Sequence, residues 1–281
     1  MTAFDRRITP YREDLAAASL KGKVDAPRFV EPELMRIAVP ALGMRSAPRP
    51  EAAYTTEALM GELVRVFEIR DGWAWGQLAD DGYVGYLPAE GLAPDHGEPT
   101  HVVAVPCATL YPAANIKVQP IITISFGAKL RAVGEAEGFV AVENGRFAFA
   151  SHVQPIGPVG QDFVAVAEKF LGAPYVWGGR QWTGIDCSGL VQVSLRATGI
   201  DCPRDSDMQE KGLGKALDLT ALNALRRGDL VFWPGHVGIM ADGETLLHAT
   251  GHYMQVVREP LAEVVARIRK QGTEIRTIKR L

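Results

Sequence analysis

Between residues 39 and 155 the chain alternates apolar and polar residues in short runs that are separated by Gly, Pro, Asp and Asn. This pattern is typical of short antiparallel strands joined by tight turns. The runs also repeat. Val39-Pro recurs as Val105-Pro, and Gly72-Trp-Ala-Trp recurs as Gly138-Phe-Val-Ala, each 66 residues further on (105 − 39 and 138 − 72). The repeat predicts two copies of one small β unit.

The pattern changes after residues 156–160, which are rich in Gly and Pro. Residues 162–170 carry apolar side chains at helical spacing, and a second helix is predicted to begin at Cys187. Four strand-like runs follow, at residues 229–233, 236–240, 245–249 and 254–257. A domain with helices first and a sheet afterwards belongs to the α+β class.

These changes predict four segments along the chain. Residues 1–38 form an N-terminal extension with a helix around residues 14–20, residues 39–97 and 98–157 form the two β units, and residues 158–281 form the α+β domain. The extension carries no candidate chemistry, so we expect it to wrap or brace the rest of the molecule.

Composition excludes several classes of function. The 30 Lys and Arg residues nearly balance the 33 Asp and Glu residues, for a net charge of −3, so no nucleic-acid partner is expected. No apolar run approaches the roughly 18 residues of a membrane helix, and three cysteines make no disulfide framework. The N-terminus lacks the apolar run of a signal peptide, so we expect the cytosol.

Cys187 is the strongest candidate for chemistry because of its place at the predicted start of a helix. Asp186 is a good N-cap, and Leu190, Val191 and Leu195 give the helix a buried side. A thiol in the first turn lies at the positive end of the helix dipole, which favours the thiolate. The alternative is a small buried cysteine without chemistry, and Cys107 and Cys202 are interpreted in that way.

Two histidines can supply a base and a group that orients it. His236 opens an apolar strand, and His248 lies twelve residues on (248 − 236), beyond the Asp242-Gly turn. A regular two-residue loop would place the two imidazoles on opposite faces. Cooperation therefore requires a loop of odd length or a bulge, which we predict. Two unrelated histidines are the alternative, and His252, in a predicted turn, is the competitor for the third position.

No metal site or cofactor is expected. No pair of Cys or His residues has the spacing of metal ligands such as CxxC or HExxH. His96, His101 and His152 lie in or beside the β units, without partners in the sequence.

The C-terminal part resembles the NlpC/P60 family of papain-like cysteine peptidases. The residues that carry the resemblance are the aromatic-Gly-Gly at 177–179, Asp186-Cys-Ser-Gly, Arg227-Gly-Asp-Leu and Gly235-His-Val-Gly, in this order. The resemblance covers about residues 159–281 and implies a Cys187–His236–His248 triad. The β units resemble bacterial SH3-like barrels, through the segments beginning at residues 61, 72 and 82.

Two SH3-like units before such a domain further resemble the γ-D-glutamyl-L-diamino acid dipeptidyl-peptidases. In that group Tyr175, Asp186, Ser188 and Ser206 match positions that line the catalytic or substrate pocket. The first SH3-like unit contributes residues there as well, and the candidates in this chain are Glu62 and Tyr83.

The internal repeat offers an independent view of these two candidates. At the aligned positions the second copy has Ala128 in place of Glu62 and Arg146 in place of Tyr83. The repeated frame therefore does not require the carboxylate or the phenol of the first copy. The alternative interpretation is a solvated strand charge and a turn residue.

The resemblance implies cleavage of the γ-D-Glu–diamino acid bond of small murein peptides with a free N-terminal L-Ala, as in the recycling of cell-wall peptides. Asp186, Glu62 and the Ser188 hydroxyl are expected to receive the free amine. Two rival hypotheses remain open. One is an exported murein endopeptidase that acts on intact wall, and the other is a non-catalytic wall-binding scaffold with an unreactive Cys187.

Overall fold

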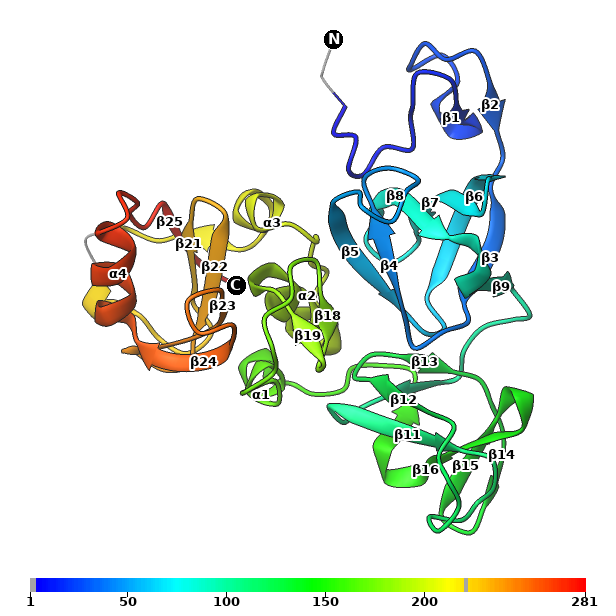
Figure 1. The fold of residues 1–281 in the computed structure, drawn as a ribbon. Helices are drawn as coiled ribbons and strands as arrows, with labels where there is room; N and C mark the ends of the chain where they lie inside the picture. Colours follow the sequence, from blue (N-terminus) through cyan, green and yellow to red (C-terminus); the bar gives the residue numbers. More distant parts are fainter. Residues whose placement is uncertain (1–3, 220–221) are drawn as a thin grey trace. The chain divides into compact units, whose positions relative to one another are not determined.

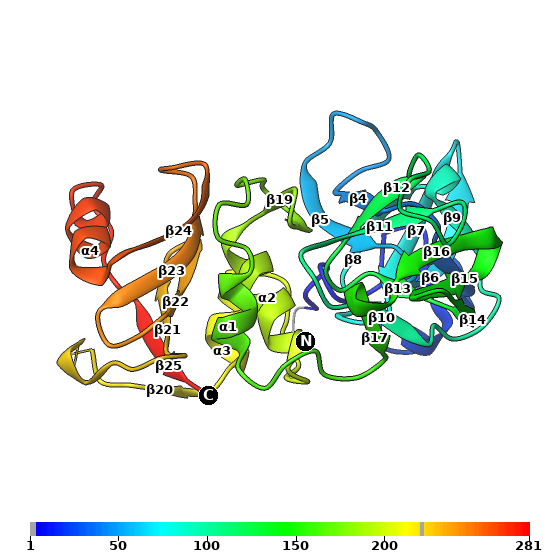
Figure 2. The ribbon, with the colours of Figure 1, turned by 90° about the horizontal axis from the view of Figure 1, so that it is seen from below.

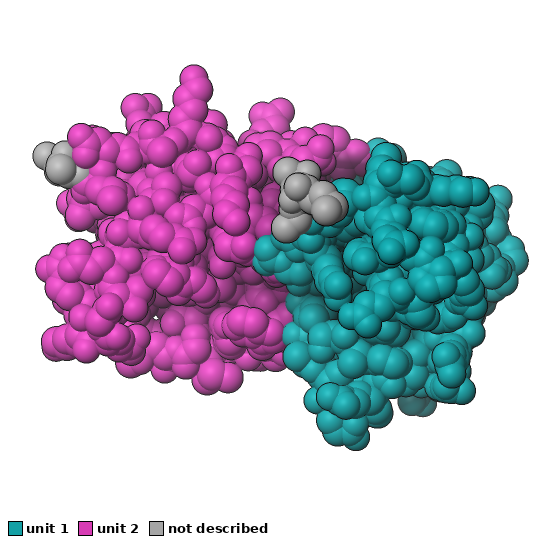
Figure 3. Space-filling view, turned by 90° about the horizontal axis from the view of Figure 1, so that it is seen from above, with its two compact units in different colours: residues 1–156 teal, residues 157–281 magenta. Residues whose placement is uncertain are grey.

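The computed structural model describes residues 4–219 and 222–281, and the chain forms two compact units, Met1–Ile156 and Gly157–Leu281. Figure 3 colours the two units differently, and each is described here by itself. Among the described residues, none of the helices combines the length and the apolar character needed to cross a membrane.

The first unit begins with an extension that is not helical as predicted. It pairs β1 (Ala16–Ala17) with β2 (Phe29–Val30) in parallel, and a single 3-10 turn, η1, covers Ala18–Leu20. Leu15 and Ala17 lie in one buried cluster with Phe67 and Trp75. The prediction of a helix at residues 14–20 is therefore wrong. The backbone at Ala16–Ala17 is extended and pairs with β2, while Leu15 and Ala17 pack against the β structure.

A seven-stranded sheet comes next, with strand order β5-β4-β8-β7-β6-β3-β9, and its strand β3 lies within residues 1–38, which were predicted as an extension. Its apolar residues alternate along the strands and meet in one core that includes Ile37, Met44, Val64 and Leu87. The strands are β3 (Glu33–Ile37), β4 (Ala41–Arg45), β5 (Tyr54–Leu59), β6 (Leu63–Arg70), β7 (Trp73–Leu78), β8 (Val84–Pro88) and, after the 3-10 turn η2 (Ala89–Gly91), β9 (Leu92–Pro94).

The next segment repeats this arrangement. Its strands are β10 (His101–Val103), β11 (Cys107–Tyr111), β12 (Ile122–Ser125), β13 (Lys129–Leu130), β14 (Ala132–Ala136), β15 (Phe139–Val142), β16 (Arg146–Phe149) and β17 (Val153–Pro155), with 3-10 turns η3 (Glu143–Gly145) and η4 (Ala150–His152). β10 pairs with β13 and β17 as β3 pairs with β6 and β9. β11 pairs with β12 and β16 as β4 pairs with β5 and β8. The pairing thus follows the repeat found in the sequence.

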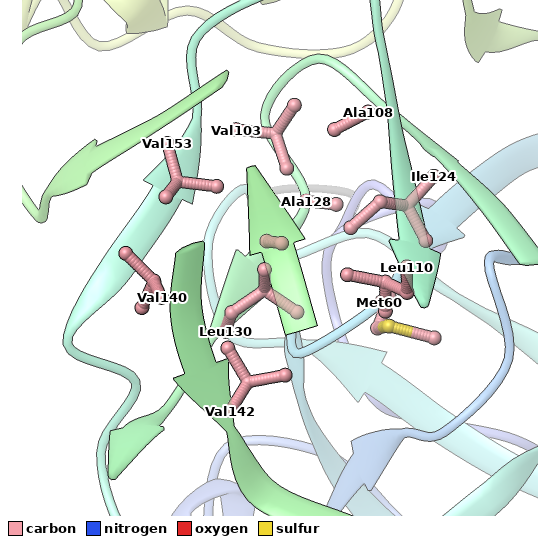
Figure 4. Close-up of a cluster of buried hydrophobic side chains, with 11 residues drawn as sticks. Met60, Val103, Ala108, Leu110, Ile124, Ala128, Leu130, Val140, Val142 and Val153 are labelled. Atoms are coloured by element: carbon pink, nitrogen blue, oxygen red, sulfur yellow. The ribbon is translucent and has the colours of Figure 1, made fainter. Parts of the chain in front are cut away.

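The turn between β5 and β6 joins the two β assemblies of this unit. Met60 lies in the buried cluster of the second assembly, beside Leu110 and Ile124 (Figure 4). Its carbonyl accepts a hydrogen bond of 2.8 Å from the N–H of Lys129. Gly61 has a φ of +80°, and a Cβ there would come within 2.2 Å of the Lys129 carbonyl oxygen. Only glycine fits this contact.

The second unit is built on a six-stranded sheet of order β20-β25-β21-β22-β23-β24. Its strands are β20 (Lys215–Ala216), β21 (Leu230–Trp233), β22 (His236–Met240), β23 (Thr245–Thr250), β24 (Gln255–Pro260) and β25 (Thr277–Arg280). A separate small hairpin pairs β18 (Arg180–Gln181) with β19 (Gly184–Ile185). The four strand-like runs of the sequence are therefore confirmed, whereas β25 was not predicted.

Helices flank this sheet on both sides (Figures 1 and 2). They are α1 (Phe163–Glu168), α2 (Cys187–Ala197), α3 (Ser206–Gly212) and α4 (Leu261–Arg269), with a 3-10 turn η5 (Leu222–Ala224). α2 packs against β22 and β23, and α4 packs against β24. Met240 and Leu246 share a buried cluster with Leu261 and Val264 of α4. The α+β prediction is confirmed, although α3 and α4 were not predicted.

Candidate active site

The first turn of α2 is built around the side chain of Asp186. Its carboxylate accepts a hydrogen bond of 2.6 Å from the N–H of Gly189, which makes it the N-cap that the sequence predicted. Gly189 is itself required here, because a Cβ would come within 2.4 Å of the carbonyl oxygen of Gly179. The helix therefore begins in close contact with the preceding loop and places Cys187 at its first position.

Cys187 lies against the strand that begins with His236. Only 6% of its surface is exposed, and the N–H groups of Val237 and Ser188 are hydrogen-bonded to its sulfur, which acts to lower its pKa. Because Val237 directly follows His236 on β22, the thiol and the imidazole belong to adjacent parts of the structure. The fold thus places Cys187, at the start of α2, next to the start of β22, about fifty positions further along the chain.

The loop between β22 and β23 meets the predicted geometric condition. Met240 pairs with Leu246, and the N–H of Ala241 donates to the carbonyl of Thr245 at 2.8 Å. Three residues, 242–244, therefore form the loop. Asp242 stabilises it by accepting hydrogen bonds from the N–H groups of Glu244 and Thr245, at 2.8 and 2.7 Å. The prediction of an odd loop is confirmed.

This register puts His236 and His248 on the same face of the sheet. Nε2 of His236 and Nδ1 of His248 are 2.8 Å apart. The side chain of His248 is 1% exposed, so its ring is held inside the unit. His252, the competitor for this position, lies in the exposed turn between β23 and β24. The structure therefore pairs the two histidines that the sequence proposed.

A carboxylate lies on the far side of His248. Oε1 of Glu259 is 2.7 Å from Nε2 of His248. The register of β23 and β24 pairs His248 with Val257 and Leu246 with Glu259, so the two polar side chains are diagonal neighbours on one face. Arg267 of α4 donates to both carboxylate oxygens of Glu259, at 2.6 and 2.7 Å. A continuous row of hydrogen bonds therefore runs from His236 to α4.

Burial sets the protonation state of the candidate pair. Removal from water raises the pKa of the Cys187 thiol to about 12, assisted by the nearby charge of Asp186. Burial likewise lowers the pKa of His236 to about 3, with His248 and Arg267 acting in the same direction. Both shifts favour the uncharged forms. The expectation that the helix dipole would favour a thiolate is therefore wrong for the resting site, because desolvation is the larger effect.

Asp186 has a buried counter-ion that the sequence did not suggest. Arg204, 1% exposed, donates to the two carboxylate oxygens at 3.0 and 2.7 Å. Arg204 also donates to the Ser188 hydroxyl at 2.8 Å, and that hydroxyl lies 3.2 Å from Asp186. The N–H of Gly178 donates to the second carboxylate oxygen at 2.8 Å. Both oxygens of Asp186 are therefore engaged within the unit.

The other predicted substrate residues of this unit lie around the same helix start. Burial is the main cause that raises the pKa of the Tyr175 phenol, and the neighbouring Cys187 and Asp186 act in the same direction. Ser206 is the first residue of α3 and is half-buried. Gln209 of α3 donates one hydrogen bond of 2.9 Å to the carbonyl of Ser188 in α2. The roles of Tyr175, Asp186, Ser188 and Ser206 in substrate binding stay predictions.

Glu62 and Tyr83 belong to the first unit. Oε2 of Glu62 accepts a hydrogen bond of 2.9 Å from the N–H of Leu59, across the turn that joins the two β assemblies. Tyr83 lies in the buried cluster of the first assembly, with Leu78 and Leu87. These contacts give both residues a structural role, and a role in substrate binding stays a prediction.

Three residues that contact the candidate site were missed in the sequence: Arg204, Glu259 and Arg267. No sequence motif marks Arg204, because its partner Asp186 is 18 positions away and only the fold brings the two together. Glu259 could have been suspected from its position on the strand after His248, but only with the register of that strand pair known. Arg267 lies on α4, a helix that the sequence pattern did not predict.

Comparisons with known proteins agree with this geometry. A family model described as the bacterial dipeptidyl-peptidase SH3 domain matches residues 44–92, and the NlpC/P60 family model matches residues 172–273. These matches confirm the predicted fold, an NlpC/P60 domain preceded by SH3-like β structure. The SH3 match covers the first β assembly only, so an SH3-like identity for the second stays a prediction.

Two curated relatives carry the same name, γ-D-glutamyl-L-lysine dipeptidyl-peptidase. The protein from Bacillus cereus is 29% identical over 203 residues, which are 63% of this chain and 59% of the relative. The protein from Bacillus subtilis is 28% identical over 228 residues, which are 72% of this chain and 75% of the relative. The chain thus matches less than two thirds of the first relative's length.

A solved structure shares the fold. The crystal structure of an NlpC/P60 family protein from Bacillus cereus matches 88% of this chain and 99% of its own, with a TM-score of 0.73 and 23% sequence identity. At that identity the match shows the fold and nothing further.

Arg204 should matter for stability far more than an arginine on the surface. Arg204→Met leaves the Asp186 carboxylate buried without its cation, so we expect a loss of about 3–5 kcal/mol in urea unfolding. Asp186→Asn combined with Arg204→Met should lose less, because no buried charge remains. Arg269→Met, which breaks an exposed pair with Glu274, is the control and should change stability by about 1 kcal/mol or less. Equal losses of stability in Arg204→Met and Arg269→Met would contradict this account.

The resting thiol should be uncharged over the neutral range. A raised pKa means that the proton stays on sulfur until the pH is well above the ordinary thiol value of about 8.5. The ultraviolet absorbance of the Cys187 thiolate, taken as the difference between the wild type and Cys187→Ala, should therefore develop only in alkaline solution. A constant thiolate signal from mildly acid to neutral pH would show a preformed ion pair with His236 and would contradict the prediction.

Proposed function

We propose that this chain, whose residues 172–273 match the NlpC/P60 family model, is a cysteine peptidase that hydrolyses the γ-D-Glu–diamino acid bond of murein peptides with a free N-terminal L-Ala. The released product is L-Ala-γ-D-Glu, as in the recycling of cell-wall peptides. The observation that carries the proposal is the Cys187 thiol beside the N–H of Val237, next to the His236–His248 pair at 2.8 Å.

The first step is the attack of sulfur on the γ-carbonyl carbon of D-Glu. The proton of the Cys187 thiol moves to the imidazole of His236, and sulfur forms a bond to the carbonyl carbon. Proton transfer within the site suits a resting pair in which both groups are uncharged. It removes the need for a stable thiolate, because the charge develops only as the bond forms.

The first turn of α2 supports the anion that forms on the carbonyl oxygen. Backbone N–H groups at a helix start point along the helix axis toward the residue that precedes them. The Gly189 N–H is taken by Asp186 and the Ser188 N–H by the sulfur of Cys187, which leaves this role to the N–H of Cys187 itself. A donor of this kind is worth about 10²–10³-fold in kcat.

Collapse of the tetrahedral intermediate breaks the bond to the diamino acid. The proton held by His236 passes to the leaving amine, and L-Ala-γ-D-Glu stays attached to Cys187 as a thioester. His236 then removes a proton from water, which attacks the thioester carbon and restores the thiol. His248 keeps the imidazole of His236 oriented through both steps.

Two findings favour a dipeptidyl-peptidase over an endopeptidase acting on intact wall. The SH3-type model that matches residues 44–92 is described for bacterial dipeptidyl-peptidases. Both curated relatives described above carry that activity in their names. The free amine of such a substrate needs acceptors, and Asp186 is less suited than its charge suggests, because Arg204 already neutralises it. The phenol of Tyr175, near Cys187, is the better candidate in this unit.

Mass spectrometry of L-Ala-γ-D-Glu-diaminopimelate tests the activity directly. The wild type should convert the tripeptide to L-Ala-γ-D-Glu and free diaminopimelate, and Cys187→Ala should leave it intact, because no other group of the site can form the thioester. Cys202→Ala, which removes another buried thiol, is the matched control and should retain activity. Conversion by Cys187→Ala, or no conversion by the wild type, would overturn the proposal.

The free amine should be a requirement for efficient cleavage. N-acetylation of L-Ala removes the positive charge and leaves the pocket groups without their partner, at about 1–3 kcal/mol for each unsatisfied group. We therefore expect kcat/KM to fall by about 10-fold or more on the acetylated tripeptide. Equal rates on both peptides would instead favour an endopeptidase that accepts peptides within intact wall.

A further inference from the structure

Glu259 is a buried carboxylate that the proposed reaction does not use directly. Only 6% of its surface is exposed. It lies behind His248, with Oε1 at 2.7 Å from Nε2 of the imidazole. Arg267 holds both of its oxygens through two parallel hydrogen bonds of 2.6 and 2.7 Å, the geometry in which a guanidinium fixes a carboxylate most firmly.

The contacts of Glu259 keep it ionised. Burial acts to raise its pKa, but the hydrogen bonds from Arg267 and His248 act in the opposite direction and outweigh it, so the pKa lies below its usual value. An ionised carboxylate can only accept hydrogen bonds. Nε2 of His248 must therefore carry a hydrogen and donate it to Glu259.

That hydrogen determines the state of every nitrogen in the row. Burial lowers the pKa of His248, so its ring is neutral and carries a single N–H. With the hydrogen on Nε2, Nδ1 of His248 is an acceptor. Nε2 of His236, 2.8 Å away, must then be the donor. A neutral His236 with its hydrogen on Nε2 has a free lone pair on Nδ1.

We propose that Glu259, fixed by Arg267, is a positioning residue that selects the tautomers of His248 and His236 and so leaves Nδ1 of His236 free to accept the proton of Cys187. The inference rests on the thiol chemistry of the proposed function but not on the identity of the substrate. During the reaction the proton moves from sulfur to Nδ1 of His236 and later to the leaving amine. The carboxylate stays ionised throughout and stabilises the imidazolium through His248.

Removal of the carboxylate should abolish this selection. Oε1 of Glu259 is shared by His248 and by Nη2 of Arg267, at 2.7 and 2.6 Å, so an amide would turn its NH2 to a donor of Arg267 in either orientation. Glu259→Leu avoids this and leaves Nε2 of His248 without an acceptor. Neither tautomer of His248 is then favoured, and part of the His236 population carries its hydrogen on Nδ1, where the thiol proton has to go.

Nitrogen-15 NMR of the imidazole rings is the direct test, and it needs no substrate. In the wild type His236 should carry its hydrogen on Nε2, and in Glu259→Leu a substantial fraction of the rings should carry it on Nδ1. The kcat on the tripeptide should fall by about 100-fold, at the lower end of what a positioned general base contributes, with KM nearly unchanged. Iodoacetamide labelling of Cys187 at neutral pH should slow in parallel, because it depends on His236 but not on a peptide.

A double-mutant comparison separates positioning from a merely structural role. His248→Asn puts a carbonyl oxygen close to the place of Nδ1, where it can accept from His236 without help from Glu259. In that background Glu259→Leu should change kcat by less than about 3-fold. Glu168→Leu is the matched control: this carboxylate pairs with Arg227 and Arg258 in the same unit and should leave the tautomers and kcat unchanged.

The outcomes are distinct. An unchanged His236 tautomer in Glu259→Leu, or an equal loss of kcat in the wild-type and His248→Asn backgrounds, would overturn the role of Glu259. A hydrogen on Nδ1 of His236 together with slow labelling supports it, even if the tripeptide is cut by none of the proteins, in which case only the proposed substrate fails. Thermal unfolding of each variant verifies that the histidine row is compared in folded protein.

Discussion

The candidate site depends on the register of three neighbouring strands, β22, β23 and β24. Side chains on a strand alternate between faces, so a shift of one residue would move a whole set of polar groups to the other side. A three-residue loop after Ala241 brings His236 and His248 to one face. The pairing of Leu246 with Glu259 then adds the carboxylate to the same row. Each member can therefore meet the next at hydrogen-bonding distance.

Removal from water governs how this row can act. A positive helix end and a nearby base would, in an exposed site, favour a thiolate and an imidazolium. In this unit burial is the larger effect and favours the neutral forms of both Cys187 and His236. The ionised groups around them are kept in matched pairs, Asp186 with Arg204 and Glu259 with Arg267. Charge is thus held beside the reacting atoms and not on them.

The ion pair with Arg204 gives Asp186 a structural role at the start of α2. Asp186 was expected to receive the substrate amine, yet its oxygens cap α2 and bind Gly178 and Arg204. A residue can lie next to a nucleophile and serve mainly to hold its backbone in place. In the first unit, the carboxylate of Glu62 likewise has a structural contact, because it stabilises the turn that carries Met60 into the core of the second β assembly.

The sequence by itself determined the elements with strong local signals: the repeated β pattern, the strands of the α+β domain, and the N-capped helix with Cys187 at its start. It also determined the condition for two histidines to meet, because parity along a hairpin follows from loop length alone. Only the tertiary structure decided the partners of these residues. Asp186 and Arg204, like Glu259 and Arg267, are joined by packing between elements, which no local periodicity records. The protonation states of Cys187 and His236 follow from burial, a property of the folded unit as a whole.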